Sequence, residues 1–336
     1  MSPSDKKHAL VVYACRKQDQ NAREKFTSFW NSYNKHVAGY DHDLLIIKKG
    51  FEKTDSFWNS LERQIAHLSF DLKEYPDRNY LSGYYRTVIE ENPEKYILFL
   101  TSSCELHSDH WLKKMMQHAS PNNLLGTCAA FESPADGYIR RQKEIPPLTL
   151  KNILRCSRKT RKKWINRFLG RPQTIEHHPV FSYDYFLPFP NPGIRTHAFM
   201  VPPGILNRIG FYPKTECCIA KEMEFVFESG IIGLSKQALL AGMKLLVVGA
   251  DGEAYPMEKW YESNTFRTKI QENMLIGDHH TRNYAEASPE MKKKYEEISY
   301  GGGNVDMQET HDIISKLDMT TFESVFYKLM NVIKSQ

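Results

Sequence analysis

Short runs of apolar residues divide the first part of the chain at regular intervals. Residues 8–14, 43–48 and 96–100 are almost wholly apolar, and a fourth run covers 124–131. Runs of this length without polar alternation are typical of strands that are covered on both faces of a sheet. We therefore expect four buried strands in this part of the chain.

Between these runs, apolar residues recur at the three- and four-residue spacing of helices. One such stretch starts near residue 21, a second covers 57–68 and a third covers 84–92, where Pro93 ends it. Strands and helices in alternation predict an α/β fold with a doubly wound, mostly parallel sheet.

The pattern after residue 135 is weaker. Residues 187–203 are rich in proline and indicate a loop, residues 236–241 a helix and residues 244–248 a short apolar strand. A mostly polar region follows, and the tail carries an apolar stripe at helical spacing. We expect packing to be the main role of that last helix.

Composition limits the class of protein. The chain has 336 residues, of which 41% are hydrophobic and 25% charged, as in ordinary globular proteins. No apolar run approaches the ~20 residues that span a bilayer, and the first residues lack the apolar segment of a signal peptide. The six cysteines include no Cys-x-x-Cys pair. We therefore expect a cytoplasmic protein with reduced thiols and no structural zinc.

Positive charge is concentrated in one segment. Residues 151–171 hold nine basic residues and no acidic one, with Trp164 and Phe168 among the apolar residues between them. Such a segment suits an anionic membrane surface, on the inner face of the membrane. A solvated helix or loop is the alternative. No recognition motif accompanies the charge, so we do not expect a nucleic acid partner.

The strand at 96–100 runs directly into a polar turn, Thr101-Ser102-Ser103. Open α/β sheets bind ligands at the carboxyl ends of their strands, so a ligand is expected at this turn. The turn after the first strand should border the same site. It contains no Gly-x-Gly-x-x-Gly, which argues against a dinucleotide.

Four segments carry a family resemblance when they are taken together. The first two are Tyr-Ile-Leu-Phe-Leu-Thr-Ser-Ser-Cys-Glu-Leu at 96–106 and Pro-Asn-Pro-Gly-Ile-Arg-Thr-His at 190–197. The third is Phe-Glu-Ser-Gly at 227–230 with the apolar strand that follows, and the fourth is Thr-Phe-Arg at 265–267 with the residues up to 278. The set resembles bacterial family 2-like glycosyltransferases of the GT-A type, in a subgroup without the standard Asp-x-Asp motif. The resemblance covers roughly residues 8–301.

This resemblance implies a division of the chain. Residues 1–135 would form the nucleotide-sugar-binding half of a GT-A domain, and 187–303 its acceptor and catalytic half. Residues 136–186 would be a basic insertion, and 304–336 a helical C-terminal extension. The donor would contact residues around the first strands and the second segment: Tyr13, Ala14, Arg16, Asp77, Tyr84, Thr101, Ser102, Ser103 and Arg195.

The Thr-Ser-Ser turn stands where related enzymes carry the Asp-x-Asp carboxylates, which bind Mn²⁺ or Mg²⁺ beside the donor diphosphate. Hydroxyl groups cannot supply that charge. If a metal is bound, Glu105 or Asp278 is its expected ligand. We favour neutralisation by arginine, with Arg267 before Arg195, because arginine binds phosphate in a bidentate manner. A protein without catalytic activity is the third possibility.

Inversion at the anomeric carbon requires a base that deprotonates the acceptor hydroxyl. The resemblance implies a carboxylate at the start of a helix in the second half of the chain, and Glu228 is our first candidate before Glu222 and Glu224. Trp260 and Gln271 are the residues expected to contact the acceptor.

The leading interpretation is therefore an inverting glycosyltransferase. It would move a sugar from a nucleotide-sugar donor to a glycan or lipid-linked acceptor in surface polysaccharide biosynthesis. Two alternatives stay open: a non-catalytic relative that binds nucleotides or carbohydrates, and a nucleotidyltransferase. The missing glycine-rich loop after the first strand counts against the latter.

Overall fold

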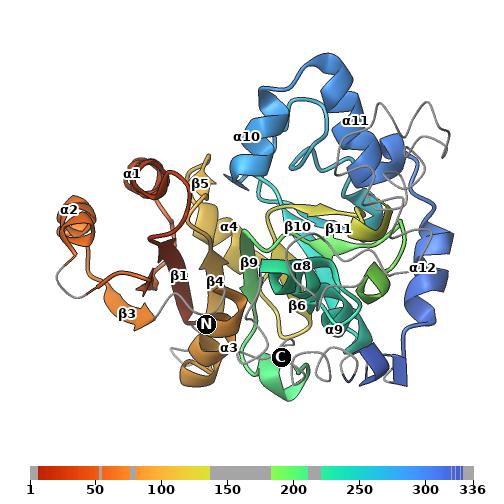
Figure 1. Cartoon of the computed structure of the whole chain (residues 1–336), viewed down its shortest axis with the longest axis horizontal. Coiled ribbons are helices and arrows are strands. Elements are labelled where there is room, and N and C mark those ends of the chain that lie inside the picture. The colour runs from red at the N-terminus through yellow and green to blue at the C-terminus, as the bar shows by residue number, and fades with distance from the viewer. Residues whose placement is uncertain are drawn as a thin grey trace, which may run out of the picture.

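The structure is a computed structural model of the chain, shown in Figure 1. It describes residues 7–52, 55–75, 81–136, 183–210, 221–318, 320, 321, 323–325 and 327. The predicted basic insertion lies almost entirely outside these residues, as does Asp77.

One large sheet organises the described part of the chain. Its eight strands follow the order β11-β10-β6-β9-β4-β1-β2-β3, and all run in the same direction except β9 and β11. The strands are β1 (Ala9–Arg16), β2 (Asp43–Lys49), β3 (Asp71–Tyr75), β4 (Tyr96–Leu100), β6 (Asn123–Gly126), β9 (Ala198–Val201), β10 (Lys244–Val248) and β11 (Ala254–Pro256). This mixed α/β architecture with a mostly parallel central sheet confirms the predicted α/β fold class.

Helices cover both faces of this sheet, because successive side chains of a strand point to opposite faces. One face packs on α1 (Ala22–Lys35), α2 (Ser56–Ile65) and α4 (Trp111–Gln117). The other packs on α3 (Leu81–Glu91), α8 (Lys221–Ser229) and α9 (Leu234–Leu240). The strands at the centre, β1 and β4, are buried along nearly their whole length.

Three strands of this sheet were not expected from the sequence: β3, β9 and β11, the last of which falls in the region that appeared merely polar. β9 lies inside the proline-rich stretch that indicated a loop, yet it pairs antiparallel with both β4 and β6 at the centre of the sheet. The prolines flank its four residues and do not interrupt them, so each of those residues can still donate to a neighbouring strand. β3 is an exposed edge strand, and edge strands tolerate the polar sequence Asp-Leu-Lys-Glu-Tyr.

The helices of residues 279–300 lie above the carboxyl edge of the sheet, and the helix of residues 307–315 lies along the side of the molecule (Figure 1). Two small strand pairs join β5 (Glu105–Leu106) to β12 (Ile276–Gly277), and β7 (Ala129–Ala130) to β8 (Gly193–Ile194). The helices are α10 (His279–Ala285), α11 (Pro289–Tyr300) and α12 (Met307–Ser315), with short 3-10 helices at Tyr183–Tyr185, Ile205–Asn207, Met257–Lys259 and Gly301–Gly303. α10 and α11 fall in the region that appeared merely polar from its sequence.

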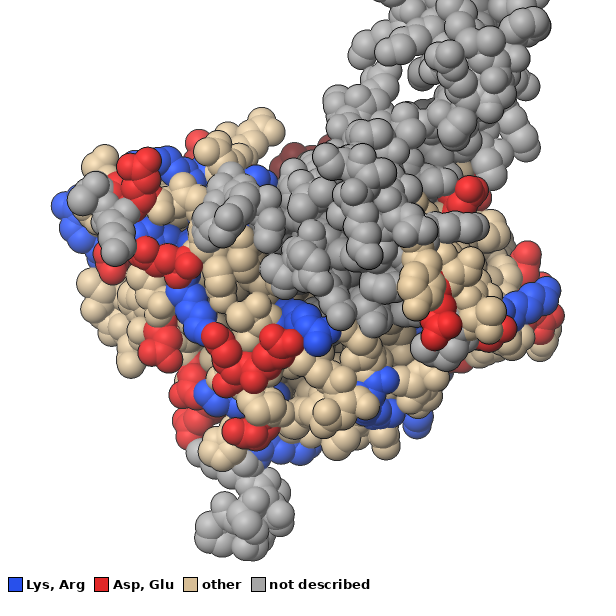
Figure 2. All heavy atoms as spheres, turned by 60° about the horizontal axis from the view of Figure 1, so that its bottom comes forward, with Lys and Arg blue, Asp and Glu red and all other residues tan. Residues whose placement is uncertain are grey.

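The opposite, lower face of the molecule carries charge of both signs. Figure 2 shows acidic and basic side chains interspersed there, so the described part of this face presents neither sign alone. None of the helices in the described ranges combines the length and the apolar content needed to cross a membrane.

Candidate active site

The turns after β1 and β4 adjoin at the carboxyl edge of the sheet, as predicted. The two strands are parallel neighbours. The hydroxyl of Tyr13 donates to the carbonyl of Ser102 at 3.3 Å, and the hydroxyl of Ser102 donates to the carboxylate of Asp19 in the first turn. These bonds join the two turns at the expected ligand edge, where Ser102 and Ser103 are buried and Thr101 is partly exposed.

Several residues expected at the donor lie deeper than the prediction assumed. Tyr13 and Ala14 are fully buried, and the ring of Tyr13 stacks on Phe29 with 4.0 Å between ring centroids. Tyr84 is buried and stacks on Tyr75 at the same distance. A donor could contact the main chain of this region or the partly exposed Arg16. The donor role of all these residues stays a prediction.

The antiparallel strand β9 brings further residues to this edge. Because β9 runs against β4, the residues before it lie where β4 ends, and the amide of Thr101 donates to the carbonyl of His197 at 2.9 Å. Arg195 and Thr196 therefore lie close to the Thr-Ser-Ser turn, although they are far from it in sequence.

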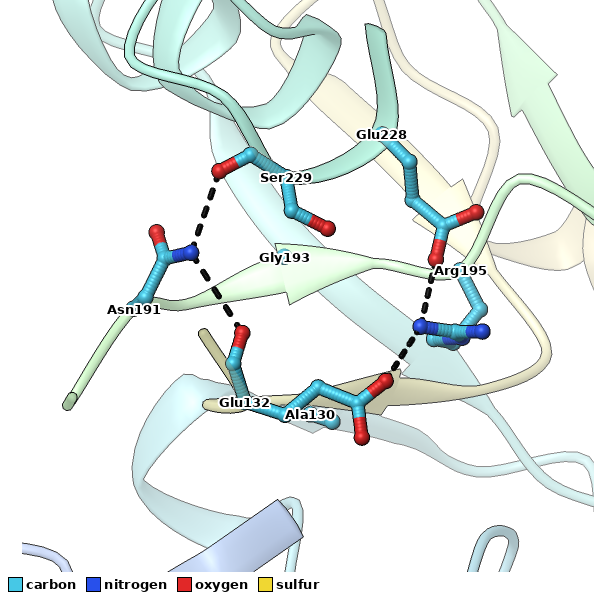
Figure 3. Close-up of a pocket in the computed structure, with 7 residues that line it drawn as sticks. All are labelled: Ala130, Glu132, Asn191, Gly193, Arg195, Glu228 and Ser229. Carbon is cyan, nitrogen blue, oxygen red and sulfur yellow. Dashed lines mark hydrogen bonds and ion pairs between the residues drawn. The ribbon is translucent and has the colours of Figure 1, made fainter. Parts of the chain in front are cut away.

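Arg195 lies between two carboxylates (Figure 3). One nitrogen of its guanidinium binds Glu132 at 2.5 Å and also forms an ion pair with Glu228. Arg267 binds the other oxygen of Glu132 at 2.7 Å. The structure therefore brings together three residues that the sequence singled out, and it adds Glu132 as the group that joins the two arginines.

Glu132 is a functional candidate that sequence reasoning missed. It follows the predicted strand at 124–131 directly, and a carboxylate at that position was the available signal. Burial raises the pKa of Glu132, but Arg195 and Arg267 outweigh burial, so its net pKa lies below the usual range. Ser299 adds a weak contact at 3.4 Å. Glu132 is thus held as an anion between two cations.

Glu228 lies at the end of α8, not at the start of a helix as the resemblance implied. Its side chain is 18% exposed. One carboxylate oxygen meets Arg195, and the other accepts a hydrogen bond from the hydroxyl of Thr196 at 2.7 Å. Both oxygens have a partner in this arrangement, and each oxygen keeps a second lone pair that could accept a proton.

Arg267 is fixed by an unusual backbone. Its φ is +48°, and Asn264, Lys269 and Gln271 in the same loop also have positive φ. Non-glycine residues rarely adopt this conformation, and such strain is often found at functional sites. The side-chain oxygen of Gln271 accepts from the amide of Arg267 at 2.8 Å, and its nitrogen donates to the carbonyl of Thr281 at 3.0 Å.

Trp260 and Gln271, the two residues expected to contact an acceptor, are buried in the interior of the protein. Gln271 is buried and holds the Arg267 loop, and Trp260 is 1% exposed and packs on Phe131. An acceptor could reach either side chain only if this packing opened.

A cavity of about 10 Å³ lies beside the carboxylates, roughly enough for one water molecule. Figure 3 shows its lining, which comprises Ala130, Glu132, Asn191, Gly193, Arg195, Glu228 and Ser229. The amide nitrogen of Asn191 donates to the carbonyls of Ser229 and Glu132, which ties α8 to the segment after β7.

The expected metal ligands are committed to other contacts. Glu105 pairs with Arg282 at 3.2 Å. Asp278 caps α10 through one oxygen that accepts from two backbone amides. Burial raises the pKa of Asp278, but nearby histidines outweigh burial, and its net pKa lies well below the usual range.

The ligand atoms of Asp278, His279 and His280 lie within 4.8 Å of one another, which is close enough for a shared cation. However, a nitrogen of Arg267 lies 3.5 Å from Nδ1 of His280 and would repel it. A metal would also have to share Asp278 with the helix cap. These residues do not make a good cation site, so we assign no chemical step to a metal.

No family model matches the sequence, and no curated protein is similar to it. Among solved structures, the apo form of mouse xyloside xylosyltransferase 1 is similar over 70% of this chain and 81% of its own. The sequence identity is 9% and the TM-score 0.33. A likeness at this level carries no argument about function.

Proposed function

We propose that this protein is a glycosyltransferase that moves a sugar from a nucleotide-sugar donor to a glycan or lipid-linked acceptor, with inversion at the anomeric carbon. The proposal extends to surface polysaccharide biosynthesis, which is the context that the sequence resemblance implies. A hydroxyl-lined turn and a carboxylate–arginine cluster share the carboxyl edge of a mostly parallel sheet, where such folds bind ligands.

One observation carries the proposal. The three residues 195–197 connect the Glu132–Arg195–Glu228 cluster to the Thr-Ser-Ser turn, through the hydrogen bond between Thr101 and His197. A donor lying on the turn would therefore point its sugar toward the cluster. Glycosyl transfer needs both parts, a place for the diphosphate and a carboxylate beyond the anomeric carbon.

Glu228 is the proposed base. It would accept the proton of the acceptor hydroxyl as the acceptor oxygen bonds to the anomeric carbon and the bond from the sugar to the diphosphate breaks, which releases the nucleoside diphosphate. Arg195 and Arg267 are the proposed counter-charges, and they can meet a diphosphate only by giving up part of their contact with Glu132 or Glu228. Release of Glu228 from Arg195 would also free the base, so donor binding and base activation would occur together.

A screen of nucleotide sugars tests the proposal. Thermal shifts with and without Mn²⁺ identify the donor, and release of the nucleoside diphosphate in the presence of a polysaccharide or lipid-linked acceptor measures transfer. Stabilisation by a nucleotide sugar with diphosphate release supports the proposal. Stabilisation without any turnover would indicate the non-catalytic alternative, and formation of pyrophosphate from a nucleoside triphosphate would indicate a nucleotidyltransferase.

A further inference from the structure

The charges of the cluster that contains Arg195 and Arg267 largely cancel. Each arginine is paired with Glu132, and Arg195 is paired with Glu228 as well. The two arginines are nearly buried, with side chains 12% and 9% exposed. A diphosphate entering this cluster would meet two carboxylates, so the cluster is a poor first contact for an anion.

A different cation lies directly at the Thr-Ser-Ser turn. Two nitrogens of Arg282, on α10, contact the carbonyl of Ser103 at 3.3 Å. The side chain of Arg282 is 37% exposed, and its carboxylate partner Glu105 is 31% exposed. Nδ1 of His279 lies 3.4 Å from the hydroxyl of Ser103, and its side chain is 51% exposed.

The fold holds these two side chains in place. β12 pairs with β5, which follows the turn, so α10 begins directly above it. The capping box of Asp278 and Thr281 fixes the first turn of the helix. A Cβ on Gly277 would lie 2.7 Å from the side chains of Met274 and Thr281, so only glycine allows this approach.

We propose that Arg282 and His279, together with the hydroxyls of Thr101 and Ser103, form a binding site for a phosphoryl group, and that the diphosphate of the donor occupies it. The inference rests on the proposed function for the identity of the ligand, but the site itself is defined by this geometry. It adds a first counter-charge on α10, which a diphosphate would meet before it reaches Arg195 and Arg267.

The chemistry of the site suits an oxyanion. The guanidinium of arginine is a planar fork that binds two phosphate oxygens, and it stays charged at every working pH. The hydroxyls of Thr101 and Ser103 are 3.3 Å apart and can each donate to the same phosphate. Glu105 competes for Arg282, so a phosphoryl group would displace a carboxylate that is already partly in solvent.

Calorimetric titration with inorganic pyrophosphate in EDTA tests the site. We expect Arg282→Gln to weaken binding roughly 10- to 100-fold, which corresponds to the loss of charge-assisted hydrogen bonds. Arg63→Gln is the matched control, because Arg63 is exposed on α2 and bonds the carbonyl of Asn59 in its own helix. Pyrophosphate binding by Arg282→Gln at the wild-type affinity would overturn the proposal.

A second variant is expected to change pyrophosphate affinity in the opposite direction, and its result does not depend on whether Arg282→Gln folds. Glu105→Gln removes the competing carboxylate and should bind pyrophosphate more tightly than the wild type, because Arg282 is then uncontested. A merely structural ion pair would give unchanged or weaker binding, and that result would also overturn the proposal. Melting temperatures of both variants check that the fold is intact.

Failure of this inference can be separated from failure of the proposed function. Pyrophosphate binding that depends on Arg282, without transfer from any nucleotide sugar, would support the phosphoryl site and reject the proposed glycosyltransferase activity. Sugar transfer that is unaffected in Arg282→Gln would keep the activity and reject the site.

Discussion

The guanidinium of Arg195 forms an ion pair with the carboxylate of Glu228, the side chain expected to take a proton in catalysis. Thr196, the next residue, donates to the other carboxylate oxygen. The three residues therefore lock the carboxylate in one orientation. If Glu228 is the base, an acceptor hydroxyl must reach a lone pair that these two contacts leave open.

Glu228→Gln should lower turnover by roughly 10²–10⁴-fold, because glutamine keeps the shape and the contact with Thr196 but cannot accept a proton. Donor affinity should not fall, because the change leaves both arginines in place and removes a carboxylate that competes for Arg195. Steady-state kinetics with saturating donor and acceptor measure the effect. Glu224→Gln, on the same helix, tests the alternative candidate and should keep turnover near the wild-type value, and near-normal turnover of Glu228→Gln would move the role to Glu224 or Glu222.

Activity should survive exhaustive treatment with EDTA. Glu105 is paired with Arg282, and one oxygen of Asp278 caps α10, so the two expected metal ligands are poorly placed to hold a cation. Turnover in EDTA, compared with turnover in added Mn²⁺ or Mg²⁺, checks this. Strict dependence on Mn²⁺ would reject charge neutralisation by arginine and point to Asp278 with His279.

The strands that the sequence predicted well are those buried on both faces. The predicted strand at 96–100 coincides with β4, and 244–248 with β10, because continuous apolar runs have few other structures available to them. β9 is equally buried, but it has only four residues and prolines on both sides. Its place between β4 and β6 depends on pairing with distant strands, which local pattern does not encode.

The residues of the candidate site also divide into those that local sequence indicates and those that distant strand pairings bring together. Glu228, Arg195 and Arg267 could be selected from their motifs, but the residue that joins two of them, Glu132, could not. Its contacts arise from a strand pairing between β7 and β8 that are more than 60 residues apart in sequence. Arg282 was missed for a similar reason, since its proximity to Ser103 depends on the pairing of β5 with β12.

Residues 151–171 should bind membranes that contain anionic lipid. They lie outside the described residues, so this prediction rests on their nine positive charges and the apolar residues between them. Co-sedimentation with vesicles should require anionic lipid and weaken as NaCl rises, because salt screens charge over about 8 Å at physiological ionic strength.

Replacing Arg161, Lys162 and Lys163 with glutamate should release the protein from these vesicles while activity on a soluble acceptor persists. The same change at Lys292, Lys293 and Lys294, a run of three lysines on α11, is the matched control. Equal binding to neutral and anionic vesicles would remove the electrostatic argument.

Lys236 should make stability depend on pH near neutrality. Its side chain is fully buried on α9, and its Nζ donates to the carbonyl of Pro192 at 2.5 Å. Next to it, the hydroxyl of Ser235 accepts from the amide of Ile194 at 2.9 Å. The two residues hold the strand β8 that leads into Arg195, so this buried amine supports the candidate site.

Burial lowers the pKa of Lys236 to about 7, from the ordinary lysine value of 10.5. Between these two values the unfolded chain binds more protons than the folded one, so the contribution of Lys236 to stability rises with pH by up to about 1.4 kcal/mol per pH unit. Below pH 7 both states are protonated and the cost of burying the charge is constant. Lys236→Met removes this group and should flatten the dependence.

Urea unfolding at pH 7, 8 and 9 measures the effect as the difference in unfolding free energy between the wild type and Lys236→Met. Other titrating groups are common to both proteins and cancel in that difference. In Lys293→Met, at an exposed position on α11, the unfolding free energy should change with pH as it does in the wild type. If the unfolding free energy of Lys236→Met also changes with pH as it does in the wild type, Lys236 is not the buried amine that the structure describes.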